Sequence, residues 1–333
     1  KTTISTLNMK NYSIAVVSLA AFCCVMSVFA GYLQITAAPD STCALKEDRS
    51  VICWGDLMYT TTANIPGPNA DFVQIASGGG GSSGGSYVCA LRQNSSVACW
   101  GSNSDGQTTV PTPNSGFTKI ATGGYHTCGL KSDSSIKCWG WNVFNQLAVP
   151  SPNSNFVDVT AGAYHACGLK SDSSVVCWGY NNYHQTEVPS PNSGFVSIAA
   201  GQVDVCGVKT DSSVVCWGAF YHYIPEVNTN FTQVYPSRTY YTCALKNDQS
   251  VECWGENSYG QGTVPSPNTN FVQVSAGNYH TCGLKSDKGI VCWGNNENSK
   301  ATVPCDDPYC AACSASNVCN TCAANRTFVT SCQ

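Results

Sequence analysis

The stretch Cys167-Gly168-Leu169-Lys170-Ser171-Asp172-Ser173-Ser174-Val175-Val176-Cys177-Trp178-Gly179 decides the fold of this chain. Its pattern is a cysteine, nine residues, a second cysteine and Trp-Gly, and it returns seven times at a period of about 39 residues. Self-similarity at such a period is typical of repeat architectures, in which each unit buries its faces only against its neighbours. The sequence therefore predicts an array of seven similar units.

Within each unit, the two cysteines predict a stapled β-hairpin. Antiparallel partners about Asp172 have numbers that sum to 344, so Cys167 faces Cys177 on one side of the hairpin. Partners at cross-strand distance are within reach of a disulfide, and Trp178 then points to the opposite face, toward a neighbouring repeat. We expect the disulfides Cys43–Cys53, Cys89–Cys99, Cys128–Cys138, Cys167–Cys177, Cys206–Cys216, Cys243–Cys253 and Cys282–Cys292.

The rest of each repeat indicates a third strand and a polar connection. Phe156-Val157-Asp158-Val159 is one example of an alternating segment that opens with an aromatic residue, and Val149-Pro150-Ser151-Pro152-Asn153 is one example of the connection. Only 11% of the residues are charged, against about 25% in typical soluble proteins, which favours turn-rich β structure. Seven such sheets arranged radially predict an all-β, seven-bladed propeller over residues 31–304.

The repeats also resemble the regulator of chromosome condensation repeat superfamily, which includes the β-lactamase inhibitor protein II propeller. The resemblance rests on Gly124-Tyr125-His126-Thr127-Cys128-Gly129-Leu130-Lys131-Ser132-Asp133, on Val175-Val176-Cys177-Trp178-Gly179 and on Asn257-Ser258-Tyr259-Gly260-Gln261, and it covers about residues 32–304. It implies short propeller blades and ring closure by pairing of the terminal strands. Leu33–Thr36 is therefore expected to complete the blade of the final repeat. The paired cysteines depart from the family pattern, as expected for a secreted relative.

The N-terminus predicts a secretory signal over residues 1–30. Met9-Lys10-Asn11 is a short basic start, Ile14 to Phe29 is apolar, and Val28-Phe29-Ala30 has the small-residue pattern of a cleavage site. The alternative is a signal anchor that stays in the membrane. Cleavage removes two lysines and no acid, so the net charge falls from −4 to −6. This charge argues against a nucleic-acid partner. The signal and the many cysteines favour a protein that is secreted or lies on the extracellular face of the cell.

Residues 305–333 predict a separate cysteine-rich module, similar to furin-like or growth-factor-receptor-like repeats. Disulfides of open pairing are favoured over four zinc thiolates because the compartment is oxidising. A membrane association would come only through sequence beyond Gln333. The cysteines of this module are Cys305, Cys310, Cys313, Cys319, Cys322 and Cys332.

Three further features have simple interpretations. Asn94, Asn230 and Asn325 stand in glycosylation acceptor sequences, and Gly78 to Ser86 predicts a flexible Gly/Ser loop. His126, His165 and His280 recur at one position of their repeats, which favours a structural slot with a bond to nearby backbone over a metal site. We therefore expect no metal and no cofactor.

The loops that follow Trp-Gly differ while the scaffold repeats, and three of them are rich in aromatic residues. A repeat scaffold places these loops on one rim, where they either bind a ligand or seal the seams between blades. We expect a non-catalytic extracellular binding or adhesion module for a protein or a glycan. Alternatives by resemblance are a secreted enzyme inhibitor and a guanine-nucleotide exchange factor, the latter disfavoured by the signal and the charge. The candidate binding residues are Trp141, Phe144, Tyr180, Tyr183, Phe220, Tyr221 and Tyr223.

Overall fold

The computed structural model describes residues 31–56, 64–80, 85–219, 224–304, 310–313 and 319–322. The chain divides into two compact units, and Gly31–Val303 is one of them. In the other unit the structure describes Pro304 and an antiparallel pair of strands, β22 (Cys310–Cys313) and β23 (Cys319–Cys322). The predicted signal peptide and the disulfide pairing of the tail lie outside what the structure describes.

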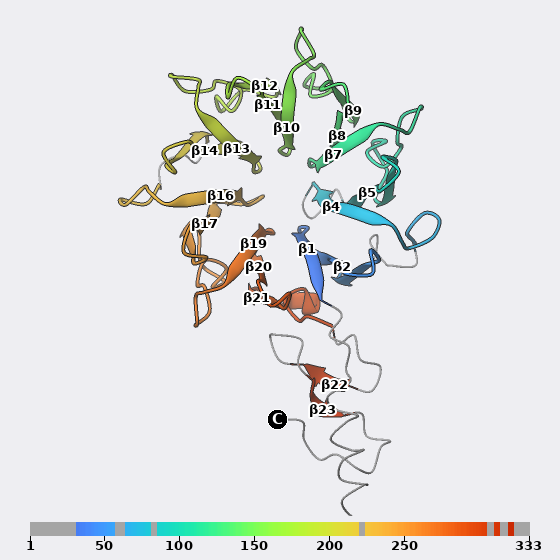
Figure 1. Cartoon of the computed structure of the whole chain (residues 1–333), viewed down its shortest axis with the longest axis vertical. Coiled ribbons are helices and arrows are strands. Elements are labelled where there is room, and N and C mark those ends of the chain that lie inside the picture. The colour runs from blue at the N-terminus through green and yellow to red at the C-terminus, as the bar shows by residue number, and fades with distance from the viewer. Residues whose placement is uncertain are drawn as a thin grey trace, which may run out of the picture. The chain divides into compact units, whose positions relative to one another are not determined.

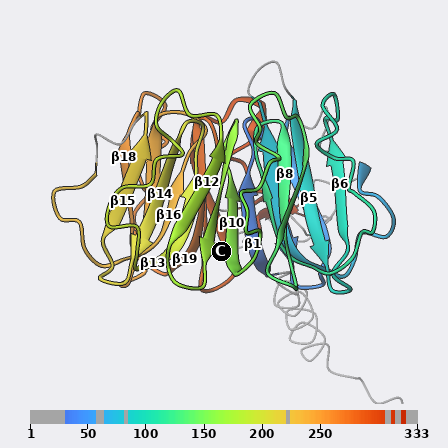
Figure 2. The ribbon, with the colours of Figure 1, turned by 90° about the horizontal axis from the view of Figure 1, so that it is seen from above.

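Within the described residues of Gly31–Val303, β1 to β21 form seven three-stranded antiparallel sheets around one axis (Figure 1). Three consecutive strands make one blade, so blade 1 is β1–β3 and blade 7 is β19–β21. Figure 2 shows the ring from the side, with the strands running between its two faces. The predicted seven-bladed propeller is confirmed.

The strand bounds repeat from blade to blade. The first strands, nearest the axis, are β1 (Tyr32–Ala37), β4 (Phe72–Gly79), β7 (Phe117–Thr122), β10 (Phe156–Ala161), β13 (Phe195–Ala200), β16 (Phe231–Pro236) and β19 (Phe271–Ala276). The middle strands are β2 (Ser41–Lys46), β5 (Ser86–Arg92), β8 (His126–Lys131), β11 (His165–Lys170), β14 (Asp204–Lys209), β17 (Tyr241–Lys246) and β20 (His280–Lys285). The outer strands are β3 (Val51–Gly55), β6 (Val97–Gly101), β9 (Ile136–Gly140), β12 (Val175–Gly179), β15 (Val214–Gly218), β18 (Val251–Gly255) and β21 (Ile290–Gly294), and a short 3-10 turn, η2, follows at Glu297–Ser299.

The hairpin of the middle and outer strands has the register that the cysteine spacing predicts. Cys167 pairs with Cys177 across β11 and β12, and their Cα atoms are 4.0 Å apart in a disulfide. Asp172 caps the turn, because its Oδ1 accepts hydrogen bonds from the Ser174 N–H and hydroxyl at 3.0 and 2.6 Å. All seven expected ring disulfides are present in the structure.

The first strand departs from the expected alternation. Phe156 pairs with Lys170 but Asp158 pairs with Leu169, so Val157 is an extra residue in a β-bulge. Val157 is 52% exposed, while Phe156 and Val159 are both buried on the same side. The period of two is therefore wrong at the start of each first strand, and the bulge directs both large residues into the seam.

An asparagine from the connecting loop covers the start of each of six outer strands. Asn153 accepts a hydrogen bond from the Ile136 N–H at Oδ1 and donates one to the Ile136 carbonyl from Nδ2, both at 2.8 Å. This pair of bonds is what a neighbouring strand would offer, so the amide protects the exposed edge. The same pair of hydrogen bonds is made by Asn69, Asn114, Asn192, Asn228 and Asn268.

The seams between blades bury the disulfides. In the seam between blades 3 and 4, Cys128 and Cys138 pack with Phe156 and Trp178, all of them buried. The disulfide face of one blade therefore meets the aromatic face of the next, as the opposite orientation of cysteine and tryptophan predicts. The Trp178 indole N–H also donates to the carbonyl of Gln146 in the preceding blade, at 2.9 Å.

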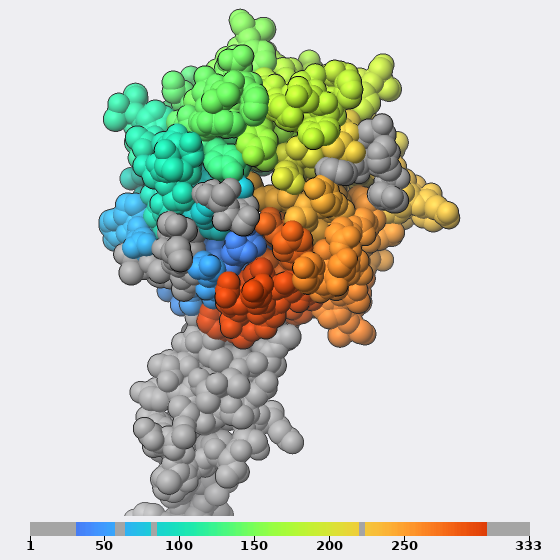
Figure 3. All heavy atoms as spheres, turned by 180° about the vertical axis from the view of Figure 1, so that it is seen from behind, coloured from blue at the N-terminus to red at the C-terminus, as the bar shows by residue number. Residues whose placement is uncertain are grey.

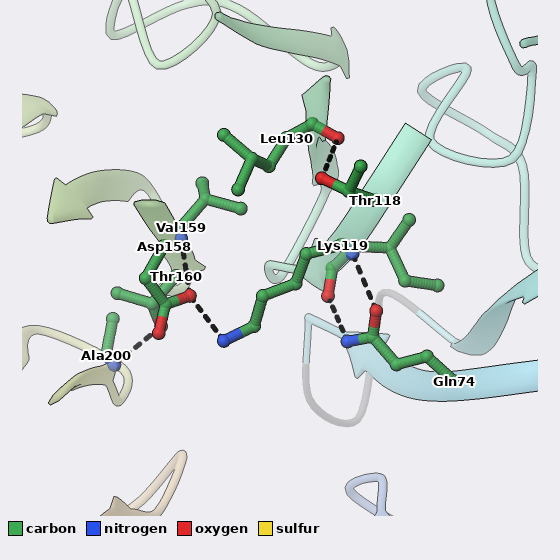
Figure 4. A network of polar contacts seen from close by, with 9 residues as sticks. Gln74, Thr118, Lys119, Leu130, Asp158, Val159, Thr160 and Ala200 are labelled. Atoms are coloured by element: carbon green, nitrogen blue, oxygen red, sulfur yellow. Dashed lines mark hydrogen bonds and ion pairs between the residues drawn. The ribbon is translucent and has the colours of Figure 1, made fainter. Parts of the chain in front are cut away.

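Polar side chains tie the first strands together near the axis (Figure 4). Gln74 of blade 2 exchanges two hydrogen bonds of 2.9 Å with the backbone of Ile120 in blade 3. Lys119 of blade 3 forms an ion pair with Asp158 of blade 4, and Thr160 accepts a hydrogen bond from the Ala200 N–H of blade 5. Each tie joins one blade to the next around the axis.

The ring closes differently from the expectation. β1 pairs with β2 of its own sheet and not with a strand of the final repeat, so Leu33–Thr36 does not complete blade 7. Closure instead uses the ordinary seam, in which Cys282 and Leu284 of blade 7 pack against Trp54 of blade 1. The Trp54 indole N–H donates to the Lys300 carbonyl at 3.1 Å, as other seam tryptophans do to a glutamine.

The Gly/Ser segment of the second repeat is only partly the loop that the sequence predicts. Gly78 and Gly79 continue β4, and Ser86 begins β5, so only part of Gly78 to Ser86 lies outside the strands. Glycine is required at Gly78, because a Cβ there would lie 2.5 Å from both the Gly123 carbonyl oxygen and the Tyr87 ring.

The glycine of Trp-Gly provides a test of the hairpin. Gly140 has a φ of +107°, and a Cβ there would lie 2.7 Å from the Tyr125 carbonyl oxygen. We expect Gly140→Ala to lower the free energy of unfolding by at least about 2 kcal/mol, since left-handed strain alone costs about 1–2 kcal/mol. Urea unfolding with the disulfides intact measures the change.

Gly106→Ala is the matched control. Gly106 has a φ of +78° and no atom within 4 Å of a built Cβ, so this variant isolates the conformational cost. Equal losses in the two variants would contradict the steric part of the argument.

Candidate functional site

An aromatic cluster lies where the loops after the Trp-Gly of blades 3 and 4 meet. It consists of Tyr125, Trp141, Phe144, Tyr164, Tyr180 and Tyr183, whose rings contact one another in a continuous chain. Figure 3 shows the face of the ring that carries these loops, with blades 3 and 4 in green to yellow-green. The cluster thus joins two blades on one face.

The fold of each loop directs its aromatic residue outward. In blade 3, Asn142 Oδ1 accepts a hydrogen bond from the Leu147 N–H, and the buried Gln146 accepts one from the Phe144 N–H, both at 2.9 Å. In blade 4, Gln185 accepts the equivalent bond from the Tyr183 N–H at 2.9 Å. Because the amides satisfy the loop backbone from inside, the rings remain on the surface.

The rings of the cluster are packed at their inner edges and exposed at their outer edges. Phe144 lies 4.6 Å from Tyr180 between ring centroids, yet it is 36% exposed, and Tyr183 is 48% exposed. Burial and the neighbouring tyrosines raise the pKa of Tyr164 to about 12. The cluster is therefore both a seal between blades and a neutral, rigid surface.

Four of the predicted binding residues, Trp141, Phe144, Tyr180 and Tyr183, come together in this cluster. Phe220, Tyr221 and Tyr223 lie outside the described residues. Sequence reasoning missed Tyr125 and Tyr164, which stand not in the loops but directly before the middle strands. Their recurrence one residue before His126 and His165 was the available signal.

A pocket of about 350 Å³, here called the mouth pocket, opens beside Tyr164. Its lining includes Tyr164, Gln202, Arg238, Tyr240, Asn278 and Tyr279. A second cavity of about 260 Å³ is lined by the first strands of all seven blades, so it is the axial channel of the ring. Arg238 lines both spaces, so the pocket and the channel approach each other at this residue.

Arg238 reaches across the ring from blade 6. Its guanidinium donates to the Gly79 carbonyl of blade 2 at 3.1 Å and to the Thr122 carbonyl of blade 3 at 2.9 Å. A longer bond of 3.4 Å joins it to the Ser77 carbonyl. Burial lowers the pKa of Arg238 from its ordinary value, because the guanidinium has lost water without gaining a carboxylate partner in the described chain.

The recurring histidines lie inside the seams. His126, His165 and His280 are fully buried, and burial lowers their pKa values to about 3, about 4 and about 3. Among the described residues no group of three metal-binding side chains comes together. The three histidines therefore lie enclosed between blades, and the expectation of no metal site stays a prediction.

His165 interacts with the backbone of Asp204, as expected, whereas His280 and His126 depart from the expected bond to backbone. His280 Nε2 lies 2.9 Å from the hydroxyl of Thr42 in the next blade. The residue equivalent to Thr42 is Ala166 in the blade after His126 and Val205 in the blade after His165. Neither residue has a hydroxyl, and His126 has no hydrogen-bond partner among the described residues.

Asp204 occupies the histidine position of blade 5. It is buried, and its Oδ1 has no hydrogen-bond partner among the described residues. Burial raises the pKa of Asp204 to about 7, although backbone N–H groups partly oppose the shift.

The structure describes two of the three predicted glycosylation acceptors. Asn94 lies exposed in the hairpin turn of blade 2, where its Oδ1 accepts a hydrogen bond from the Ser96 N–H. Asn230 is also exposed, just before β16, and Asn325 lies outside the described residues. All three stay predictions. In the part of the chain that the structure describes, no helix is long and apolar enough to span a membrane.

Val205 lacks the hydroxyl with which Thr42 bonds His280, and this difference leads to a prediction about stability. Val205→Thr is nearly isosteric and gives His165 the partner that Thr42 gives His280, so we expect a gain of about 0.5–1.5 kcal/mol in the free energy of unfolding. Val208→Thr is the control, because Val208 is buried in an apolar seam and its hydroxyl would cost stability. A loss of stability in both variants would contradict the prediction, and urea unfolding distinguishes the outcomes.

Asp204 supplies a prediction on pH. The unfolded carboxyl ionises near pH 3.9 and the folded one near 7, so stability is lost as the pH rises between these values. Asp204→Asn cannot ionise, and its free energy of unfolding relative to the parent should rise from pH 4 to pH 8. Titration of both proteins with urea at several pH values measures this difference. The buried histidines have lowered pKa values, so their protonation destabilises the fold as the pH falls below about 6.5. This effect is the same in the parent and in the variant, so it cancels in the difference.

Comparison with known proteins agrees with the fold. Residues 117–146, 156–185 and 271–299 match the family model of the regulator of chromosome condensation (RCC1) repeat, and no curated protein matches the sequence. The structure is similar to the CRINKLY WD40 ectodomain of the Arabidopsis thaliana receptor kinase ACR4, with a TM-score of 0.62 and 28% identity over 81% of this chain and 97% of that chain.

Two further structures share the fold. The ectodomain of the Physcomitrella patens receptor kinase CR4 has a TM-score of 0.64 and 24% identity, over 80% of this chain and 75% of that one. Prp20p from Saccharomyces cerevisiae has a TM-score of 0.61 and 16% identity, over 83% and 85%. Three segments of the chain therefore match the RCC1 repeat model, within a propeller whose fold resembles that of two plant receptor-kinase ectodomains.

Proposed function

We propose that this propeller is an extracellular, non-catalytic module that binds a glycan across the aromatic cluster. The observation that carries the proposal is the cluster itself: six rings from two adjacent blades, held against one another, with Phe144 and Tyr183 exposed. Aromatic rings present large, rigid, weakly polar surfaces, on which the apolar faces of sugar rings stack.

The surroundings of the cluster favour a sugar over a large protein partner. The mouth pocket beside Tyr164 is about 350 Å³, which is the size of a small-ligand site. Its amide and hydroxyl side chains, among them Gln202 and Asn278, are suited to bonding sugar hydroxyls. A protein partner remains the competing outcome of the test, because tyrosine and tryptophan are also enriched at protein interfaces.

The extracellular location and the absence of catalysis rest on separate arguments. Seven disulfides are typical of an oxidising compartment, and two similar structures are receptor ectodomains. The titratable groups with large pKa shifts, such as His126 and Asp204, are enclosed in seams, where a substrate would not reach them. Inhibition of an enzyme and nucleotide exchange have no supporting feature in the described residues.

A glycan array probed with the secreted chain tests the proposal. We expect binding to a defined set of glycans, and a loss of about 3- to 10-fold in affinity for Phe144→Ala and for Tyr183→Ala. Each removed ring contact is worth about 0.5–1.5 kcal/mol. Both side chains are partly exposed, so the fold should survive the substitutions.

Val227→Ala is the matched control, because Val227 is 69% exposed and lies outside the cluster. It should bind like the parent. Absence of glycan binding, or equal binding by all four proteins, would refute the role of the cluster.

A further inference from the structure

The mouth pocket is lined by a cation, Arg238, that has no ion-pair partner among the described residues. Three of the five N–H groups of Arg238 donate to carbonyl oxygens, and Arg238 forms no ion pair with the described part of the chain. Asp40 also lines the pocket, but its carboxylate lies 3.5 Å from the ammonium group of Lys300. With the Asp40 carboxylate paired to Lys300, which does not itself line the pocket, Arg238 is left without a carboxylate partner among the described residues.

Carbonyl dipoles hold the guanidinium in place without neutralising it. Gly79 of blade 2 and Thr122 of blade 3 fix the group from the far side of the ring. Two N–H groups are left for a ligand, and burial strengthens the attraction of a partly desolvated cation for an anion. Both Nη2 N–H groups and one Nη1 N–H are engaged, so the free Nε–H and Nη1–H lie on different edges of the guanidinium. A carboxylate can therefore accept one charge-assisted hydrogen bond from either of them.

We propose that the mouth pocket binds an acidic sugar residue, with its carboxylate on Arg238 and its hydroxyl groups on the pocket amides. This assignment rests on the glycan-binding function proposed above and specifies the class of glycan. Tyr164 belongs to both the aromatic cluster and the pocket lining, so one sugar chain can lie on the cluster and extend its acidic unit inward.

The remaining lining of the pocket fits a sugar. Asn278 lines the pocket with intermediate exposure, and its side-chain amide is suited to bonding a sugar hydroxyl. Tyr240 and Tyr279 are 54% and 37% exposed, and they offer ring surfaces. An acidic peptide would also satisfy Arg238, but it has no comparable set of hydroxyl donors for the amides.

The test compares one oligosaccharide in two charge states. The probes are a tetramer of galacturonic acid and the same tetramer with every carboxylate methyl-esterified, measured by calorimetry against the secreted chain. We expect the free acid to bind at least 10-fold more tightly, and its affinity to fall with added NaCl. Tetraglutamate, the acidic peptide probe, should bind more weakly than the acidic sugar.

Variants at Gln202 test the charge without touching Arg238. Gln202 lines the pocket and has an intermediate exposure, so both Gln202→Lys and Gln202→Glu should fold. Both variants remove the Gln202 amide, and the affinity for the ester measures that loss. Relative to the ester, the lysine should raise and the glutamate should lower the affinity for the free acid several-fold. Arg238→Met should abolish the preference for the acid, and its urea unfolding separates this effect from loss of the ring ties.

The outcomes separate the two proposals. Equal affinity for acid and ester, unmoved by the Gln202 pair, would overturn the acidic-sugar assignment and leave glycan binding in place if Tyr183→Ala still weakens it. Tighter binding of tetraglutamate would overturn the assignment to a sugar. Failure of every glycan to bind would overturn both proposals.

Discussion

The structure depends on one repeated contact, in which the disulfide face of a blade packs under the tryptophan and phenylalanine of the next blade. Each hairpin is too small to bury both of its faces alone, so the bridge and the indole ring become the core of a seam. The indole N–H then reaches the loop carbonyl of the preceding blade, which places that loop on the face of the ring. The scaffold thus positions the candidate ligand-binding loops through the same contact that holds it together.

Much of the fold could be predicted because it is local. The spacing of Cys167 and Cys177 sets the hairpin register, and the side on which Trp178 lies follows from the alternation of a strand. The bulge at Val157 could not be predicted, since an alternating pattern does not reveal an extra residue. Closure by an ordinary seam was also missed, because the resemblance implied an exchange of terminal strands that β1 does not make.

Only part of the candidate site could be predicted from the sequence. Phe144 and Tyr183 stand out as aromatic residues in variable loops, whereas Tyr164 precedes a regular strand and joins the cluster only in three dimensions. Arg238 carries no local signal at all. Its partners Gly79 and Thr122 are 159 and 116 residues away, and only the closed ring brings them to the guanidinium.

The position of Lys300 has a consequence for biosynthesis. Blade 1 is the first to leave the ribosome, but its Trp54 awaits a carbonyl 246 residues downstream. The cysteine pairs, by contrast, are separated by only 10 residues, so each can oxidise as soon as its own hairpin emerges. During synthesis, the hairpins of the propeller could therefore form their disulfides one after another. The apolar face of blade 1 around Trp54 would stay exposed until the last repeat has been translated.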